Sequence, residues 1–176
     1  TYPMANYKDG VWQYLEIPSR AGAIATAGIR GNSTYTVLIA ISHPSVIGQE
    51  IWYLDETGVW YKSADINGTV YTTEQTNIGF VFAGSFDGAI TYNEDVPTEQ
   101  SLKNILIKHF REGWTAINES LVSDTIKTIK TIGSTIYFGG SASEDTESEV
   151  CLSRYNLGVM QPMIILSHFY GDPFVS

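Results

Sequence analysis

The chain has 176 residues, of which 43% are hydrophobic, 12% are aromatic and only 16% are charged. This composition excludes a disordered chain, predicts an all-β protein rich in turns, and gives enough length for one domain with a substantial core. The net charge of −9 and the pI of about 4.6 argue against a nucleic-acid backbone or an anionic membrane surface as partner, because both attract clustered Lys and Arg.

Targeting signals are sparse. No apolar run reaches the ~18 residues of a membrane span, so we expect no membrane-spanning segment. The chain begins at Thr1 without a basic and apolar leader, which predicts a processed product or a piece of a longer protein. Sequons at Asn32, Asn67 and Asn118 favour a secreted, extracellular protein, whereas a single cysteine, Cys151, leaves a cytoplasmic location open.

The first part of the chain predicts three strands. Residues 23–29 are a run of small residues, and residues 36–41 form a nearly continuous β-branched run that is typical of a strand buried on both faces. After a break at residues 43–45, residues 49–54 form a strand of bulky residues, which ends in the polar turn 55–58.

The middle of the chain contains two strong turn signals, Asn67-Gly68 and Asp87-Gly88. The strands expected around them are residues 61–67, 69–73, 78–84 and 89–92. Residues 93–100 are interpreted as an insertion. Residues 102–110 fit both helical and strand spacing, and we favour a strand because the repeat described below requires one there.

The last part of the chain contains four more segments separated by turns and by one acidic loop, residues 143–148. The first, residues 126–132, mixes helical and strand spacing, and the other three are expected strands at residues 133–140, 149–155 and 163–166. Cys151 lies in the segment 149–155 and is expected to be an inert residue of the core.

One short pattern recurs along the chain: an aromatic residue, a turn with Gly, and then Trp. Its copies end at Trp12, Trp60 and Trp114, with a weaker copy at Met160, and these residues are 48, 54 and 46 positions apart. A period near 50 residues is typical of a repeat architecture. The pattern therefore predicts a single repeat domain over residues 1–176, with units 12–59, 60–113 and 114–158.

Each unit contains about four short strands, which is typical of a β-propeller blade. The predicted fold is therefore an all-β, propeller-like array of about three four-stranded blades. Because three blades are too few to close a ring, we expect either a fragment or a ring completed by a homo-oligomer, such as a dimer of three-blade halves.

The first unit resembles the fungal fucose-specific lectins, which are six-bladed propellers. The likeness rests on the small-residue strand 23–27, the β run 36–41, the pair Gln49-Glu50 and the segment 52–60. The resemblance implies that fucose is held between blades by an Arg, a Glu and an aromatic ring. It assigns the Glu role to Glu50 and the ring role to Trp60, and the run 36–41 contains no Arg.

Sugar binding needs an aromatic face for the C–H side of the ring and polar groups for the hydroxyls. The candidate ligand-binding residues are Glu50, Trp52, Trp60, Trp12, Trp114 and Arg111. The competing interpretation is that these Trp residues pack between neighbouring units and that Glu50 is a solvated strand residue. We expect a non-enzymatic recognition module for a carbohydrate or glycoprotein, with a protein-interaction scaffold and a glycoside hydrolase as alternatives.

Signals for catalysis and for cofactors are weak. His43, His109 and His168 are isolated, and no nucleophile elbow, phosphate-binding glycine loop or paired metal-ligand spacing is present in the sequence. We therefore expect no cofactor and no metal. A different fold stays open, because Gly10-Val11-Trp12 resembles the Gly-x-Trp signature of the lipocalins, small-ligand carriers in which residues 102–110 would form the helix.

Overall fold

The computed structural model describes residues 4–15, 23–29, 37–42, 48–54, 59–93, 96–109, 113–117, 125–141 and 148–167. Every element in these ranges is a strand, which confirms the prediction of an all-β protein. The strands are β1 (Met4–Lys8), β2 (Val11–Leu15), β3 (Ala23–Ile29), β4 (Val37–Ser42), β5 (Gln49–Leu54), β6 (Trp60–Gln75), β7 (Gly79–Asn93), β8 (Val96–Ser101), β9 (Ile105–His109), β10 (Trp114–Ile117), β11 (Thr125–Ile132), β12 (Thr135–Ser141), β13 (Ser148–Asn156) and β14 (Val159–Ser167).

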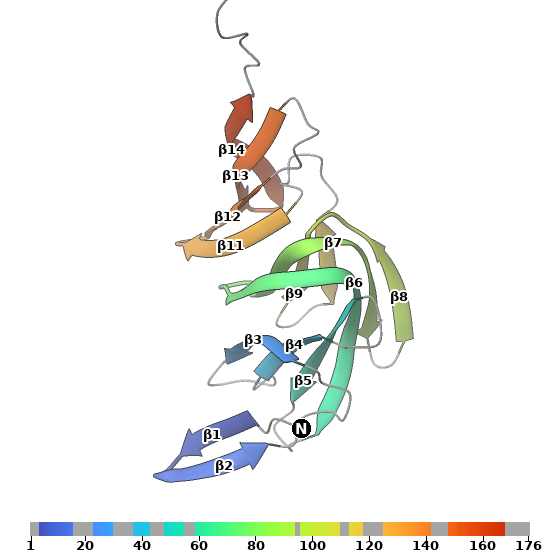
Figure 1. Ribbon diagram of the computed structural model, residues 1–176, viewed down its shortest axis with the longest axis vertical. Helices are drawn as coiled ribbons and strands as arrows, with labels where there is room; N and C mark the ends of the chain where they lie inside the picture. Colours follow the sequence, from blue (N-terminus) through green and yellow to red (C-terminus); the bar gives the residue numbers. More distant parts are fainter. Residues whose placement is uncertain are drawn as a thin grey trace, which may run out of the picture.

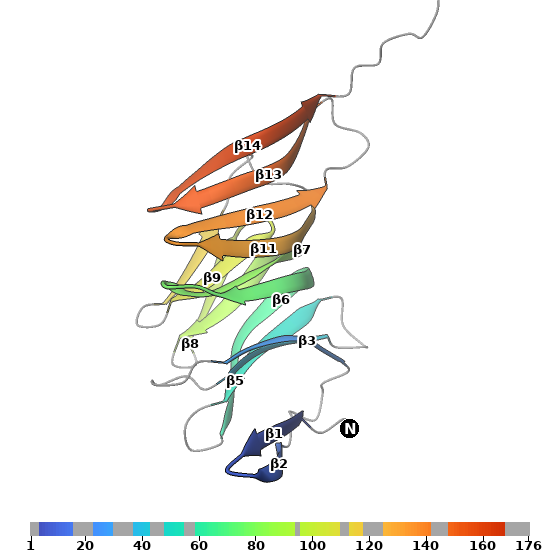
Figure 2. The same cartoon turned by 90° about the vertical axis from the view of Figure 1, so that its left-hand side faces the viewer.

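The strands form three antiparallel sheets. The hairpin β1–β2 is one sheet, β11–β12–β13–β14 is a four-stranded sheet, and the other strands form an eight-stranded sheet in the order β10-β9-β7-β6-β5-β4-β3, with β8 added to β7. Figures 1 and 2 show the small hairpin at one end of the molecule, the four-stranded sheet at the other and the large sheet between them. The path of the large sheet is open and does not close on itself.

The long hairpin β6–β7 bends where two turns were expected. Asn67 pairs with Gly88 and Gly68 pairs with Phe86, so the two predicted turns face each other as one bulge inside continuous strands. Gly68 has a φ of 134°, and a Cβ there would lie 2.3 Å from the carbonyl oxygen of Ser85. The prediction of hairpin turns was wrong because the same residue types also form bulges, which bend a strand without ending it.

The bend divides the hairpin into two halves with different neighbours. The half that begins at Trp60 pairs with β5 on one side, and β7 there pairs with β8, while the other half of β7 pairs with β9. The edge strand β8 (Val96–Ser101) thus falls largely within the segment 93–100 that was interpreted as an insertion. The bent sheet encloses a core built from Ile51, Ala64, Ile66, Val70, Phe80, Phe82, Phe86, Ala89, Leu102 and Leu106.

A second core lies between the large sheet and the four-stranded sheet. It is formed by Val81, Ala83, Ile105, Ile107, Ile117, Ile126, Ile129, Ile136, Phe138, Tyr155 and Met160. The alternation of β7 and β9 supplies both cores, because successive residues point to opposite faces. The backbone N–H of Thr131 also donates to Glu74 Oε1 at 2.9 Å, which ties β11 to β6.

The recurring aromatic-Gly-Trp pattern marks hairpins. The Cα partners across these hairpins are Tyr7–Trp12, Leu54–Trp60, Lys108–Trp114 and Tyr155–Met160. The strands therefore pair across the expected unit boundaries at residues 60 and 114, so these boundaries do not separate one sheet from another. The preference for a strand over a helix in residues 102–110 is confirmed for Ile105–His109, which form β9, while residues 102–104 precede the strand and residue 110 lies outside the described residues.

Candidate functional site

A bulge in β6 creates the most polar cluster on the large sheet. Ile51 pairs with Ala64 and Trp52 pairs with Lys62, so Ser63 is an extra residue in β6. In a regular strand, residues three positions apart point to opposite faces. The bulge returns Lys62 and Asp65 to one face, which lies opposite the core face occupied by Ile51 and Ala64.

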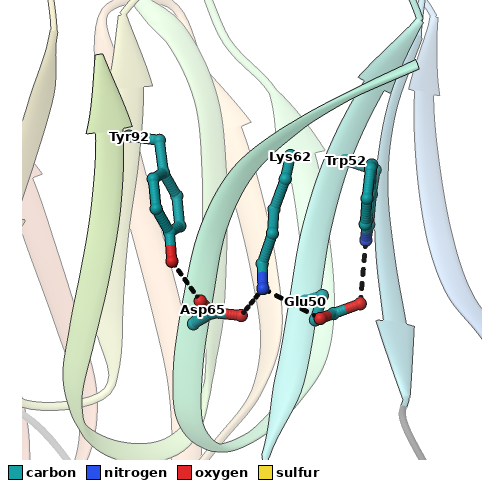
Figure 3. A network of polar contacts seen from close by, with 5 residues as sticks. All are labelled: Glu50, Trp52, Lys62, Asp65 and Tyr92. Atoms are coloured by element: carbon teal, nitrogen blue, oxygen red, sulfur yellow. Dashed lines mark hydrogen bonds and ion pairs between the residues drawn. The ribbon is translucent and has the colours of Figure 1, made fainter. Parts of the chain in front are cut away.

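Lys62 connects two carboxylates on this face (Figure 3). Its Nζ lies 2.6 Å from Asp65 Oδ1 and 2.9 Å from Glu50 Oε1. Trp52 Nε1 donates to Glu50 Oε2 at 3.0 Å, and the Tyr92 hydroxyl donates to Asp65 Oδ2 at 2.6 Å. Each carboxylate is thus fixed at both oxygens, and we call Glu50, Trp52, Lys62, Asp65 and Tyr92 the carboxylate network.

The network is partly buried, and this changes the acid–base behaviour of two members. The side chain of Glu50 is 13% exposed, whereas those of Lys62 and Asp65 are 31% and 33% exposed. Burial lowers the pKa of Lys62, but the hydrogen bonds to Asp65 and Glu50 outweigh it, and the pKa of Lys62 is raised. The hydrogen bond to Asp65 is the main cause of a raised pKa for Tyr92, with burial adding to it. Both groups therefore keep their protons to higher pH than usual.

The surface continues from the network across two further strands. Glu50, Asp65, Ile90 and Glu99 are successive Cα partners on β5, β6, β7 and β8, so their side chains share one face. A shallow depression of about 270 Å³ adjoins Asp65 and includes Ile90, Glu99 and Gln100 in its lining. The result is a mostly acidic surface that includes the exposed apolar side chain of Ile90.

The sequence-based candidates are distributed over three different environments. Glu50 and Trp52 are both in the network (Figure 3). Trp60 lies two residues before Lys62 on β6, which places it on the same face. Trp12 is 63% exposed on the separate hairpin β1–β2. Arg111 lies outside the described residues.

Trp114 is half-buried against the core of the bent sheet. It packs against the core of the bent sheet, with its ring centroid 6.0 Å from that of Phe82. Lys108 Nζ lies 5.5 Å from the Trp114 ring centroid, and burial lowers the pKa of Lys108. Among the described residues none accepts a hydrogen bond from the buried Trp114 Nε1. These contacts give Trp114 a packing role within the large sheet.

The Gln49-Glu50 pair divides between the two faces of β5. Gln49 is buried, and its Oε1 accepts a 2.7 Å hydrogen bond from the backbone N–H of Val70, just after the bend in β6. Glu50 points to the other face and joins the network. Gln49 therefore stabilises the bend, and only Glu50 is available to a ligand.

Sequence reasoning missed Lys62, Asp65 and Tyr92. Lys62 and Asp65 have the i,i+3 spacing of a helical pair, which carries no meaning in a regular strand, and Tyr92 is 27 residues from Asp65. The missing information was the bulge at Ser63. Two successive residues there, Ser63 and Ala64, are both buried, whereas a regular strand would bury every second residue.

Signals for a metal or a catalytic histidine are absent from the part of the chain that the structure describes. No group of three or more His, Cys, Asp or Glu is placed there to hold a metal ion. His109 Nε2 lies 2.8 Å from Thr115 Oγ1, a neighbour on the paired strand, and His43 and His168 are outside the described residues. In the described residues, no helix is long and apolar enough to cross a membrane.

The comparisons with known proteins give no family. No protein-family model, no curated protein and no solved structure matches this chain.

Proposed function

We propose that the chain is a non-enzymatic recognition module that binds carbohydrate on the outer face of β5, β6 and β7. The observation that carries the proposal is the carboxylate network, in which Trp52 and Tyr92 share a face with two carboxylates that are held at both oxygens. A fixed arrangement loses little side-chain entropy when a ligand binds, which favours affinity.

The chemistry of this face fits a sugar ring. Indole and phenol rings can cover the apolar C–H side of a sugar, and each carboxylate oxygen has a second lone pair that can accept a hydroxyl group. Ile90 and Glu99, which share this face and line the adjoining depression, extend the same mixture of apolar and acidic surface. Glu50, Asp65 and Glu99 outnumber Lys62, so neutral or amino sugars are the expected ligands, in preference to acidic sugars.

Hydrolysis of the sugar is the less favoured alternative. A pair of carboxyl groups that cleaves a glycoside needs one partner to carry a proton for the leaving group. Here both carboxylates accept from the same ammonium group, at 2.6 and 2.9 Å, and their other oxygens accept from Tyr92 and Trp52, so every carboxylate oxygen faces a donor. The geometry therefore supports binding better than turnover.

The propeller and the extracellular location also remain proposals. The four-stranded sheet β11–β14 has the strand number and the sequential order of a propeller blade, and this supports a blade over residues 125–167. The eight-stranded sheet does not divide into such blades. The three sequons and a glycan ligand together support secretion.

A glycan array with three proteins tests the proposed binding. The wild type should bind a subset of neutral or amino glycans, and Trp52→Ala should weaken that binding by about tenfold or more. Trp12→Ala is the matched control, because it also removes an indole but from the separate hairpin β1–β2, and it should bind like the wild type. A silent array, or equal losses for both variants with the fold intact, would exclude the proposal.

A further inference from the structure

The outer face of the four-stranded sheet carries a basic row. The row consists of four residues that are successive Cα partners across β11, β12, β13 and β14, namely Lys130, Tyr137, Arg154 and Gln161. Their sequence neighbours Ile129, Ile136, Tyr155 and Met160 face the second core, so the row points away from it. Arg154 Nε donates to Gln161 Oε1 at 3.0 Å, which orients the guanidinium group along the row.

This sheet differs in charge from the rest of the chain. Its strands contain the basic residues Lys127, Lys130 and Arg154 and one acidic residue, Glu149, whereas the whole chain has 10 basic and 19 acidic residues. Ile132 and Val159 lie on the same face as the row and are 64% and 54% exposed. Exposed apolar side chains beside Arg and Tyr are typical of a protein interface.

The large sheet carries an acidic row of the same length. This row consists of four residues that are successive Cα partners on β8, β7, β6 and β5 and share one face, namely Glu99, Ile90, Asp65 and Glu50. Neighbouring strands in any sheet are about 4.8 Å apart, so the two four-strand rows have the same spacing. When the rows are laid face to face, Lys130 meets Glu99, Tyr137 meets Ile90, Arg154 meets Asp65 and Gln161 meets Glu50.

We propose that the basic row of one copy of this chain docks on the acidic row of a second copy. The pairing joins opposite charges at two positions, an aromatic ring to an apolar side chain at the third, and an amide to a carboxylate at the fourth. Because the two surfaces are different, the contact is heterologous, and copies add head to tail. The contact covers the carboxylate network, so a sugar bound there would compete with it, but the inference does not depend on sugar binding.

The test is a charge exchange between Lys130 and Glu99, both exposed on edge strands. Sedimentation velocity of the full chain, without glycan, should show mass increasing with concentration, more strongly at low salt. Lys130→Glu and Glu99→Lys should each weaken self-association by about tenfold, because each places like charges opposite one another. The double variant in one chain, and an equal mixture of the two single variants, should both recover association to near the wild-type level.

Lys127→Glu is the control, since it makes the same charge change on the same strand outside the row. Combined with Glu99→Lys, it should give no recovery. A wild type that stays monomeric at every concentration would overturn the inference. So would an association that neither single variant weakens, or a loss that the Lys130–Glu99 exchange does not restore.

Discussion

Lys62 and Asp65 are three residues apart on β6, yet their side chains meet on one face of the sheet at 2.6 Å. The extra residue in the bulge at Ser63 is the cause, because it reverses the alternation between them. Without this bulge, Lys62 would point away from Asp65, and the Lys62–Asp65 ion pair could not form. The proposed binding face thus depends on a local irregularity of the backbone.

Replacing Lys62 with Met should destabilise the fold by about 1 kcal/mol at low salt, because Glu50 and Asp65 then face each other without a cation. Added salt should reduce the loss, since it screens the repulsion of partly exposed charges. Urea unfolding at two ionic strengths measures both effects. Lys127→Met is the control, because Lys127 is exposed on another sheet, and an equal loss in that variant would contradict the role of the network.

Alkaline pH should weaken the fold through Lys62 and Tyr92. Both have a raised pKa in the folded protein, so the folded state holds protons that the unfolded state releases, and stability falls as pH rises above about 10. Tyr92→Phe removes one of the two groups, so the stability difference from the wild type should shrink between about pH 9.5 and 11.5. Chemical unfolding across that range measures it, and a difference that stays constant with pH would count against the hydrogen bond from Tyr92 to Asp65.

Gly84 should tolerate no side chain. A Cβ at this position would lie 1.9 Å from the carbonyl oxygen of Thr69 on the paired strand β6. Gly84→Ala should therefore cost about 3 kcal/mol, because the strands must separate near the bend. Gly113→Ala is the control, since nothing lies within 4 Å of a Cβ there, and it should cost less than about 0.5 kcal/mol. Equal unfolding midpoints for the two variants would contradict the described approach of β6 to β7.

Trp114 should matter for stability and not for ligand binding. Trp114→Ala should cost about 3 kcal/mol, because it removes the ring that packs on Phe82 and lies beside Lys108. Trp114→Phe should cost less than about 1 kcal/mol, since it keeps a ring and removes a buried N–H for which no described residue is an acceptor. Thermal unfolding compares the two, and a Phe variant as unstable as the Ala variant would mean that the indole N–H has an essential partner.

The sequence predicted individual strands well where the side-chain pattern was uninterrupted. The strand at residues 49–54 coincides with β5, and the small-residue run 23–29 coincides with β3. These segments have β-branched or aromatic residues with clear turn residues at their ends, so local preference and final structure agree.

The prediction of hairpin turns was wrong where residues typical of turns lie inside a continuous strand. Asn67-Gly68 and Asp87-Gly88 have the composition of hairpin turns, but they face each other in one bulge, and Asn67 Nδ2 donates to Asp87 Oδ1 at 2.8 Å across it. Whether a glycine ends a strand or bends it depends on the partner strand, which local composition does not describe. The recurring Trp at residues 60 and 114 likewise marks a hairpin within a sheet, which local composition does not distinguish from a boundary between sheets.

Two of the five residues of the network could be predicted from the sequence. Glu50 and Trp52 are candidates because a carboxylate and an indole suit a sugar ligand, and both lie on the predicted strand 49–54. Lys62, Asp65 and Tyr92 could not be found, since their positions depend on the bulge at Ser63 and on the register of β6 with β7.

The four Trp residues allow one direct test of the proposed binding face. Titration of the isotopically labelled protein with the best glycan from the array should shift the indole N–H resonances of Trp52 and Trp60, because both lie on that face. The resonances of Trp12 and Trp114 should stay unchanged, because one indole is on the separate hairpin and the other packs against the core. Shifts confined to Trp12 or Trp114, or no indole shift at saturating glycan, would contradict carbohydrate binding at the carboxylate network.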